Sequence, residues 1–135
     1  MTTTDFNKVD EFDLFIACLR GEAEGESFIG KLAIACVIHN RVNDKRWPDN
    51  YKAVILQPFQ FSCFLPKYFR PEILVAARDK IYWRECKYAA FGVYHGWIKD
   101  ITNGANHYHT RGVSPSWSSE MKLVFEAGNH LFFKG

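Results

Sequence analysis

The densest group of side chains that could do chemistry lies in residues 21–26, whose sequence is GEAEGE. Glu22, Glu24 and Glu26 follow a mostly apolar segment that has the spacing of a helix. Negative charge is unfavourable at the C-terminal end of a helix, so the group is either a solvated helix end or a functional site. Neighbouring carboxylates and partial burial both favour the protonated form of a carboxyl group. A glutamate in this setting could therefore act as a general acid.

Two of these glutamates compete for the role of acid. Glu22 and Glu26 are four residues apart, so an unbroken helix would place both on one face. Gly25 is expected to end the helix between them, and we therefore favour Glu22 as the acid. If the reaction needs a second carboxylate, the sequence offers Glu26 and Asp100 as candidates.

Three histidines define an alternative chemistry. His107 and His109 flank Tyr108, so both would point to the same face of a strand. His130 lies in the next expected strand, and three histidines can hold a zinc ion with one open position. The favoured interpretation, with Glu22 as acid, involves no metal and no other cofactor.

Aromatic side chains also lie outside the helical stripes of the sequence. They either pack beneath loops or line a groove for sugars, whose flat rings and hydroxyl groups suit aromatic faces and amphipathic tips. The candidates are Trp47, Phe61, Trp97, Tyr108 and Trp117.

The first half of the chain must position these groups on helices. Residues 10–19 have apolar side chains at helical spacing and acidic residues in the first turn, and Gly21 and Gly25 are expected to mark the end of this helix. A second helix is expected from Ser27 to about residue 42. Because its centre, residues 32–38, is apolar on almost every face, we expect it to be the central element of the fold.

The second half of the chain changes from helix to strand. A short helix is expected over residues 51–56, irregular chain over 57–62, and a long helix from Pro71 to about Ala90, ended by Gly92 and Gly96. Residues 106–110, 123–125 and 130–133 are typical of short strands, with a hairpin turn near Gly128. The sequence thus predicts an α+β fold, mainly helical, with a small antiparallel sheet near the C-terminus.

Composition limits the function classes. The chain has 135 residues, 47% of them hydrophobic and 16% aromatic, which excludes disorder and fits a single domain over residues 1–135. A net charge of +2 gives no basic stripe for nucleic acid. No apolar run is long enough for membrane insertion, and the first residues lack the features of a signal peptide, so synthesis in the cytoplasm is expected. The four cysteines form no CxxC pair and are expected to be buried, reduced residues.

Taken together, the motifs resemble the signature of the SleB/CwlJ-type cell wall hydrolases, and the resemblance spans nearly the whole chain. The matching segments are GEAEGE at 21–26, LAIACVIHNRV at 32–42 with Gly30 before it, QFS at 60–62, DITNGANHY at 100–108, PSW at 115–117 and GNHLFF at 128–133.

The resemblance implies a lysozyme-like catalytic domain that acts on peptidoglycan as a lytic transglycosylase or muramidase. It places the acid at Glu22, with one departure at Glu24, where relatives commonly have Arg or Gly. The bond would be the one between N-acetylmuramic acid and N-acetylglucosamine. The substrate-binding positions that it implies are Gln60, Phe61, Ser62, Asn106, Tyr108, His109 and Trp117.

Two alternatives stay open. One is a zinc-dependent N-acetylmuramoyl-L-alanine amidase that uses the three histidines, and the other is a non-catalytic module that binds peptidoglycan. On the favoured interpretation the protein is a monomer whose partner is peptidoglycan. It would reach the cell wall after release, as a phage endolysin or a spore cortex-lytic enzyme.

Overall fold

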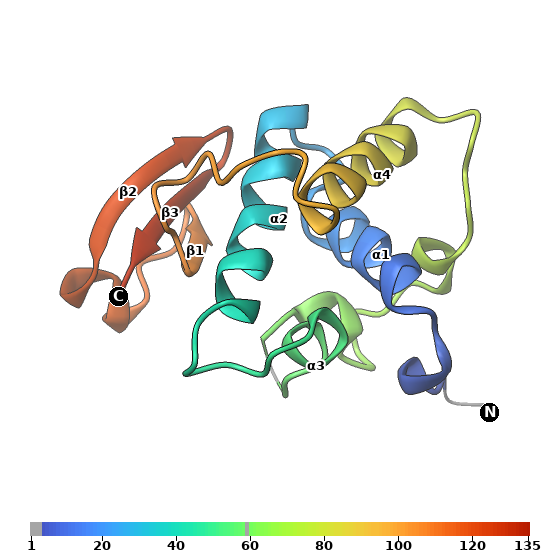
Figure 1. The fold of residues 1–135 in the computed structure, drawn as a ribbon, viewed down its shortest axis with the longest axis horizontal. Coiled ribbons are helices and arrows are strands. Elements are labelled where there is room, and N and C mark those ends of the chain that lie inside the picture. The colour runs from blue at the N-terminus through green and yellow to red at the C-terminus, as the bar shows by residue number, and fades with distance from the viewer. Residues whose placement is uncertain (1–3, 59) are drawn as a thin grey trace.

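The structure, a computed structural model, describes residues 4–58 and 60–135 and has the expected order of helices followed by strands (Figure 1). The N-terminal residues 1–3 and Phe59, which belongs to the segment expected to be irregular, lie outside the described residues. The helices are η1 (Phe6–Lys8), α1 (Glu11–Ala23), α2 (Phe28–Val42), α3 (Tyr51–Ile55), η2 (Ser62–Phe64), η3 (Pro71–Leu74), α4 (Ile81–Tyr94) and η4 (Ser116–Glu120), where η denotes a 3-10 helix. The strands are β1 (His107–Thr110), β2 (Lys122–Ala127) and β3 (His130–Lys134).

Helix α1 begins with a side-chain cap at Asp10 and ends within the cluster of glutamates at residues 22–26. The Asp10 carboxylate accepts hydrogen bonds from the backbone N–H groups of Phe12 and Asp13, which satisfies donors that the helix itself cannot pair. The helix ends at Ala23, between the two glycines that were expected to mark its end, so Gly21 itself lies inside the helix. The missing side chain of Gly21 instead leaves space for another residue, since a Cβ there would lie 2.5 Å from the Cβ of Cys63.

Helix α2 is the central element, as predicted. Ser27 caps it by accepting a hydrogen bond from the N–H of Gly30, and every residue from Gly30 to Ile38 is buried. Figure 1 shows α2 between the sheet on one side and helices α1 and α4 on the other. A helix that is covered on all sides fixes the position of everything that packs on it.

The long helix expected from Pro71 to Ala90 is wrong. The chain forms only the short helix η3, becomes extended at Val75, and starts helix α4 at Ile81. Tertiary contacts explain the break, because the buried guanidinium of Arg20 donates hydrogen bonds to the backbone carbonyls of Glu72 and Val75. The carbonyl oxygens that would continue η3 as a helix are therefore used by another element.

Helix α4 continues beyond Gly92, the first of the two glycines that were expected to end it. Gly92 lies inside the helix, where its bare backbone accommodates the side chain of Ile98, and a Cβ would lie within 2.6 Å of two atoms of that side chain. The helix ends at Tyr94, and Gly96 follows with a φ of +72°. Gly96 is thus the true terminating glycine, in the left-handed conformation that favours glycine.

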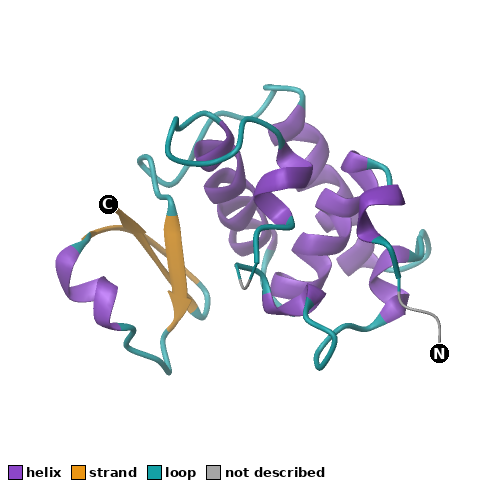
Figure 2. Ribbon diagram, turned by 90° about the horizontal axis from the view of Figure 1, so that it is seen from below, coloured by secondary structure: helices purple, strands orange, loops and turns teal. Residues whose placement is uncertain are grey.

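The strands form one antiparallel sheet in the order β1-β3-β2. Strands β2 and β3 make the predicted hairpin, with Gly128 at a φ of +54° in the turn. Tyr108, His130 and Phe132 share one face of the sheet, whereas His107, His109 and Phe133 share the other. The sheet stands beside the helical body, as Figure 2 shows from a second direction.

Other expectations from composition concern the cysteines and the membrane. Cys18, Cys36, Cys63 and Cys86 are all buried and free, as predicted. Among the described residues, no helix combines the length and the apolar character needed to cross a bilayer.

Candidate active site

Six of the predicted site residues converge on one cleft of about 330 Å³ between the helical body and the sheet. They come from the end of α1, from the segment that leads into η2, from β1 and from η4. We call this the aromatic cleft; its lining residues are Glu22, Arg41, Gln60, Phe61, Ser62, His107, Tyr108 and Trp117. Residues far apart in the sequence thus meet around a single carboxyl group, that of Glu22.

Glu22 is held by one short hydrogen bond. The phenol of Tyr108 donates to its Oε1 at 2.6 Å. Burial raises the pKa of Tyr108 well above its ordinary value, and the charge of Glu22 adds to the shift, so the phenol keeps its proton. Because Oε1 accepts from Tyr108, a proton on this carboxyl group belongs on Oε2, the oxygen left free for a substrate.

Aromatic rings form two walls of the cleft. Trp117 packs against His107, His109 and Phe133, with ring centroids 5.0 to 5.6 Å apart. Phe61 also lines the cleft, on the side of η2, but it is only 3% exposed. The role of Trp117 as a stacking surface for a sugar stays a prediction, and the nearly complete burial of Phe61 argues against that role for its ring.

Arg41 is a cleft residue that the sequence analysis did not select. Its side chain is buried, its Nε donates to the backbone carbonyl of Asn106, and its Nη1 donates to Oε1 of Gln60 at 3.0 Å. It therefore fixes the amide of Gln60 at the cleft wall. The signal was present in the sequence, because Arg41 lies in the central helix only three residues after its apolar stretch ends at Ile38.

The three histidines do not converge. His107 and His109 lie on the Trp117 side of the sheet, whereas His130 lies on the opposite face against Tyr108, at 5.3 Å between ring centroids. Within the described part of the chain, no group of three or more His, Cys, Asp or Glu residues is arranged to hold a metal ion. This geometry does not support the zinc-dependent alternative.

His107, which the sequence suggested as a zinc ligand, instead lines the aromatic cleft. Burial lowers its pKa to about 4, and the positive charges of Arg41 and Arg46 act in the same direction. The ring is therefore neutral at the pH of most cells. Its Nδ1 lies 2.8 Å from Oδ1 of Asn106.

A second hollow, of about 510 Å³, opens on the other side of Glu22. We call it the carboxylate hollow; it is lined by residues 20–26 with Arg70, Thr110, Asn129 and His130. Glu24 is paired there with Arg20 at 3.5 Å and with Arg70 at 3.4 Å. Of the residues that the structure describes, Glu22 alone lines both spaces.

Glu26 is in the carboxylate hollow, but its oxygens are engaged with the hairpin turn. Oε1 lies 2.8 Å from Nδ1 of His130 and 3.3 Å from the backbone nitrogen of Asn129. Gly128 leaves space for this carboxylate, because a Cβ at that position would overlap with Oε2 of Glu26. As predicted, α1 ends before Gly25, so Glu26 does not continue the face of Glu22.

Asp100, the other candidate for a second carboxylate, lies outside both spaces. Its side chain accepts hydrogen bonds from the N–H and hydroxyl of Thr102, from the N–H of Gly104 and from the amide of Asn40. Burial alone would raise the pKa of Asp100, but these hydrogen bonds hold it below its ordinary value. Asp100 therefore organises the loop before β1 rather than the reacting centre.

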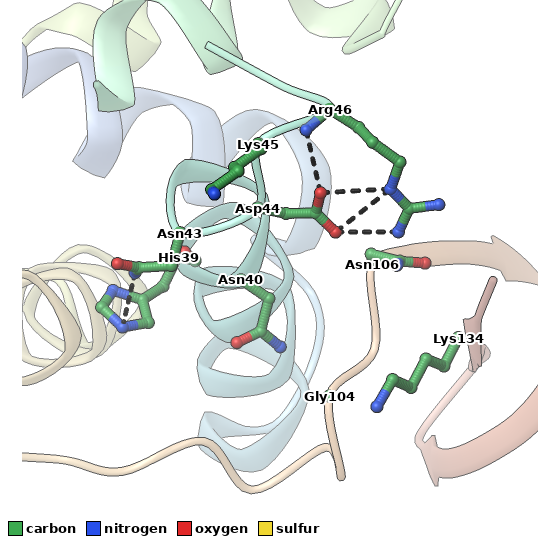
Figure 3. Close-up of a pocket in the computed structure, with 9 residues that line it drawn as sticks. All are labelled: His39, Asn40, Asn43, Asp44, Lys45, Arg46, Gly104, Asn106 and Lys134. Atoms are coloured by element: carbon green, nitrogen blue, oxygen red, sulfur yellow. Dashed lines mark hydrogen bonds and ion pairs between the residues drawn. The ribbon is translucent and has the colours of Figure 1, made fainter. Parts of the chain in front are cut away.

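Asn106 and His109 are also outside the aromatic cleft. Asn106 lines a different hollow of about 600 Å³ at the C-terminal end of α2, which Figure 3 shows with Asp44 and Arg46 joined by hydrogen bonds. Its amide pairs with the backbone of Gly135. His109 stacks on Phe133 at 5.0 Å and supports Trp117 from behind.

Of the other aromatic candidates, Trp97 is remote from the site. It packs on Phe91 at 4.9 Å near the end of α4 and is 74% exposed. Trp47 lies at the edge of the aromatic cleft, 5.8 Å from His107 between ring centroids, with the guanidinium of Arg41 over its ring.

Comparison with protein families gives a match to the family described as Cell Wall Hydrolase, over residues 25–133. The matched part contains all of the cleft residues except Glu22, which lies three residues before it.

Individual relatives carry consistent descriptions. The chain is 28% identical over 127 residues to a spore cortex-lytic enzyme of Halalkalibacterium halodurans and 27% identical over 124 residues to that of Bacillus subtilis. These alignments cover 91% of this chain but only 34% and 37% of the relatives, so the chain spans little more than a third of their length.

Solved structures share the fold. The catalytic domain of the germination-specific lytic transglycosylase SleB from Bacillus anthracis aligns with a TM-score of 0.75 and 25% identity, covering 92% of this chain and 93% of that domain. The catalytic domain of the Bacillus cereus SleB protein aligns with a TM-score of 0.73 and 24% identity, covering 99% and 100%. The predicted fold class is thereby confirmed.

Proposed function

Because the chain belongs to the Cell Wall Hydrolase family, we propose that it cleaves peptidoglycan glycan strands between N-acetylmuramic acid and N-acetylglucosamine, with Glu22 as general acid. One observation carries the proposal: a carboxyl group at the end of α1, oriented by Tyr108, lies where two hollows meet. A glycan strand must extend on both sides of the bond that is cut, and this position allows it to do so.

The first step is protonation of the glycosidic oxygen. Glu22 transfers the proton of Oε2 to that oxygen while the bond from the oxygen to the anomeric carbon breaks, and the bonding electron pair stays with the oxygen. Tyr108 donates to Oε1 throughout, so it stabilises the carboxylate that forms. The anomeric carbon becomes an oxocarbenium ion.

The second step captures this ion. The C6 hydroxyl of the same muramic acid attacks the anomeric carbon, and its proton returns to Glu22, which now acts as a base. The product is an anhydro sugar, and no water is consumed. The name of the Bacillus anthracis relative, a lytic transglycosylase, supports this outcome over hydrolysis.

The surroundings of the acid also favour this route. Hydrolysis would require a second carboxylate that acts as a nucleophile or activates a water molecule. In the described part of the aromatic cleft, Glu22 is the only carboxylate. Glu24 and Glu26 in the carboxylate hollow are committed to Arg70 and to the hairpin turn.

Replacement of the acid tests the proposal. Glu22→Gln keeps the size of the side chain and its contact with Tyr108 but removes the proton donor. We expect lysis of purified peptidoglycan, followed as loss of turbidity, to fall at least about 100-fold with an unchanged circular dichroism spectrum. Wild-type activity that a chelator abolishes and zinc restores would contradict the proposal and favour the amidase. Wall binding without any turbidity loss in the wild type would favour the non-catalytic module.

A further inference from the structure

The two spaces that meet at Glu22 differ in charge, size and access. We infer that the carboxylate hollow is the subsite for the muramic acid that becomes the sugar cation, whereas the aromatic cleft holds the leaving N-acetylglucosamine. This inference rests on the proposed function, because it assigns the two sugars on either side of the bond that Glu22 would protonate.

Charge is the first argument. In the aromatic cleft the hydrogen-bond partners of the buried Arg41 guanidinium among the described residues are neutral, a backbone carbonyl and the amide oxygen of Gln60. A sugar that develops positive charge would be repelled there, since the Coulomb interaction is strong at a buried site. In the carboxylate hollow the guanidinium groups of Arg20 and Arg70 are opposed by Glu24, and Glu26 adds a further carboxylate.

The polar groups of the lining are the second argument. His130 is 5% exposed and lines the carboxylate hollow, where its Nδ1 lies 2.8 Å from Oε1 of Glu26. With the pair of Arg70 and Glu24, this contact gives the hollow both hydrogen-bond donors and acceptors. The hydroxyl and acetamido groups of an amino sugar are suitable partners for such a lining.

Size and access are the third argument. Muramic acid is larger than N-acetylglucosamine, because it carries a lactyl group and in most walls a stem peptide. The carboxylate hollow, at about 510 Å³, is larger than the aromatic cleft, at about 330 Å³. Its rim includes the exposed residues Gly25, Arg70 and Asn129, and a Cβ at Gly25 would meet no atom within 4 Å. A stem peptide could therefore leave this hollow toward solvent.

The open space at Gly25 provides a selective test. Gly25→Trp would place an indole at the rim of the carboxylate hollow without a clash. Gly112→Trp is the matched control, because Gly112 is also exposed, also has no atom within 4 Å of a Cβ, and lines neither space. Both variants and the wild type are assayed for kcat/KM on glycan strands that carry stem peptides and on the same strands stripped of them.

We expect Gly25→Trp to lower kcat/KM at least about tenfold on peptide-bearing strands and several-fold less on stripped strands, because the indole blocks the exit of the peptide. Gly112→Trp should match the wild type on both. Equal losses on both substrates, or no loss, would overturn the assignment of muramic acid to this hollow. If the wild type cleaves neither substrate, the proposed function fails instead. Should Gly25→Trp not fold, Gly25→Leu replaces it in the same comparison.

Discussion

The hydrogen bond from Tyr108 to Glu22 is the contact on which the chemistry of the cleft depends most directly. Tyr108→Phe removes the hydroxyl but keeps the ring, which packs on Phe132 and His130. We expect kcat to fall about tenfold to a hundredfold with little change in KM, because a hydrogen bond to a charged group is lost from the reacting carboxyl group. Initial rates of turbidity loss over a range of substrate concentrations measure both constants.

A matched control exists elsewhere in the fold. Tyr94 also donates its hydroxyl to a carboxylate, that of Glu11 at 3.0 Å, but it lies outside both the cleft and the hollow. Tyr94→Phe should keep the wild-type kcat. If Tyr108→Phe does the same, Tyr108 has no part in orienting the acid.

His107 makes stability depend on pH in a defined direction. Its pKa in the folded protein is about 4, because burial and the charges of Arg41 and Arg46 disfavour the protonated ring. In the unfolded chain an ordinary histidine has a pKa of about 6.5. Between pH 4 and pH 6.5 the unfolded chain binds more protons than the folded protein, so the free energy of unfolding rises with pH. The contribution of His107 to stability is therefore lost as the pH falls from about 6.5 to about 4.

A histidine variant isolates this contribution. Between pH 7 and pH 4.5, His107→Gln should lose less free energy of unfolding than the wild type, by on the order of 1–2 kcal/mol, and its Tm should fall correspondingly less; the value is reduced because the ring is partly solvated. Thermal melts followed by circular dichroism at the two pH values give the difference. Parallel losses in both proteins would show that His107 is not buried in its neutral form.

At the level of residues, the structure brings together several positions that the family resemblance implied. Glu22, Gln60, Phe61, Ser62, Tyr108 and Trp117 line one cleft, and their roles there stay predictions. Arg41 was missed because a cation near the end of a helix ordinarily faces solvent. Asn106 was misplaced because its amide pairs with the last residue of the chain, a partner that no local pattern reveals.

The contact between α1 and η2 fixes the relative positions of two segments that line the aromatic cleft. Gly21 makes the contact possible, since an added Cβ would lie 2.5 Å from the Cβ of Cys63 and 2.7 Å from its Sγ. Gly21→Ala should lower the free energy of unfolding by a net ~1–2 kcal/mol, because overpacking costs more than the helix propensity of alanine returns. It should also lower activity, because Ser62 and Glu22 adjoin the contact.

Chemical denaturation checks the stability change, with Gly112→Ala as control. Gly112 is exposed and a Cβ there meets nothing within 4 Å, so its alanine variant should unfold at the wild-type denaturant concentration. An unchanged midpoint for Gly21→Ala would mean that η2 can move away from α1 at no cost.

Elements with their own caps and periodicity were predictable, and elements set by tertiary contacts were not. Ser27 and the apolar centre of α2 indicated both its start and its burial, and Gly128 indicated the hairpin. The segment after Pro71 has a composition that permits a helix. Its backbone carbonyls at Glu72 and Val75 instead accept hydrogen bonds from Arg20, which lies more than 50 residues away in the sequence. A single sequence does not reveal such a partner.

At the scale of the whole molecule, the central helix α2 joins a sheet to a helical body, and the acid lies where they meet. The net charge of +2 would suit the proposed anionic substrate and gives no basic stripe for nucleic acid. The chain corresponds to about a third of the length of relatives such as the Halalkalibacterium halodurans enzyme, and it belongs to the Cell Wall Hydrolase family over residues 25–133. The family match supports the proposed action on peptidoglycan.

The masses of the fragments released from purified peptidoglycan test the central claim most directly. Digestion by the wild type in water enriched in ¹⁸O, followed by mass spectrometry, identifies both the bond that is cut and the fate of the anomeric carbon. The account predicts fragments that end in anhydro-muramic acid, one water molecule lighter than hydrolysis products and without ¹⁸O, and none from Glu22→Gln. Free stem peptides with intact glycan strands, or reducing muramic acid that carries ¹⁸O, would contradict it.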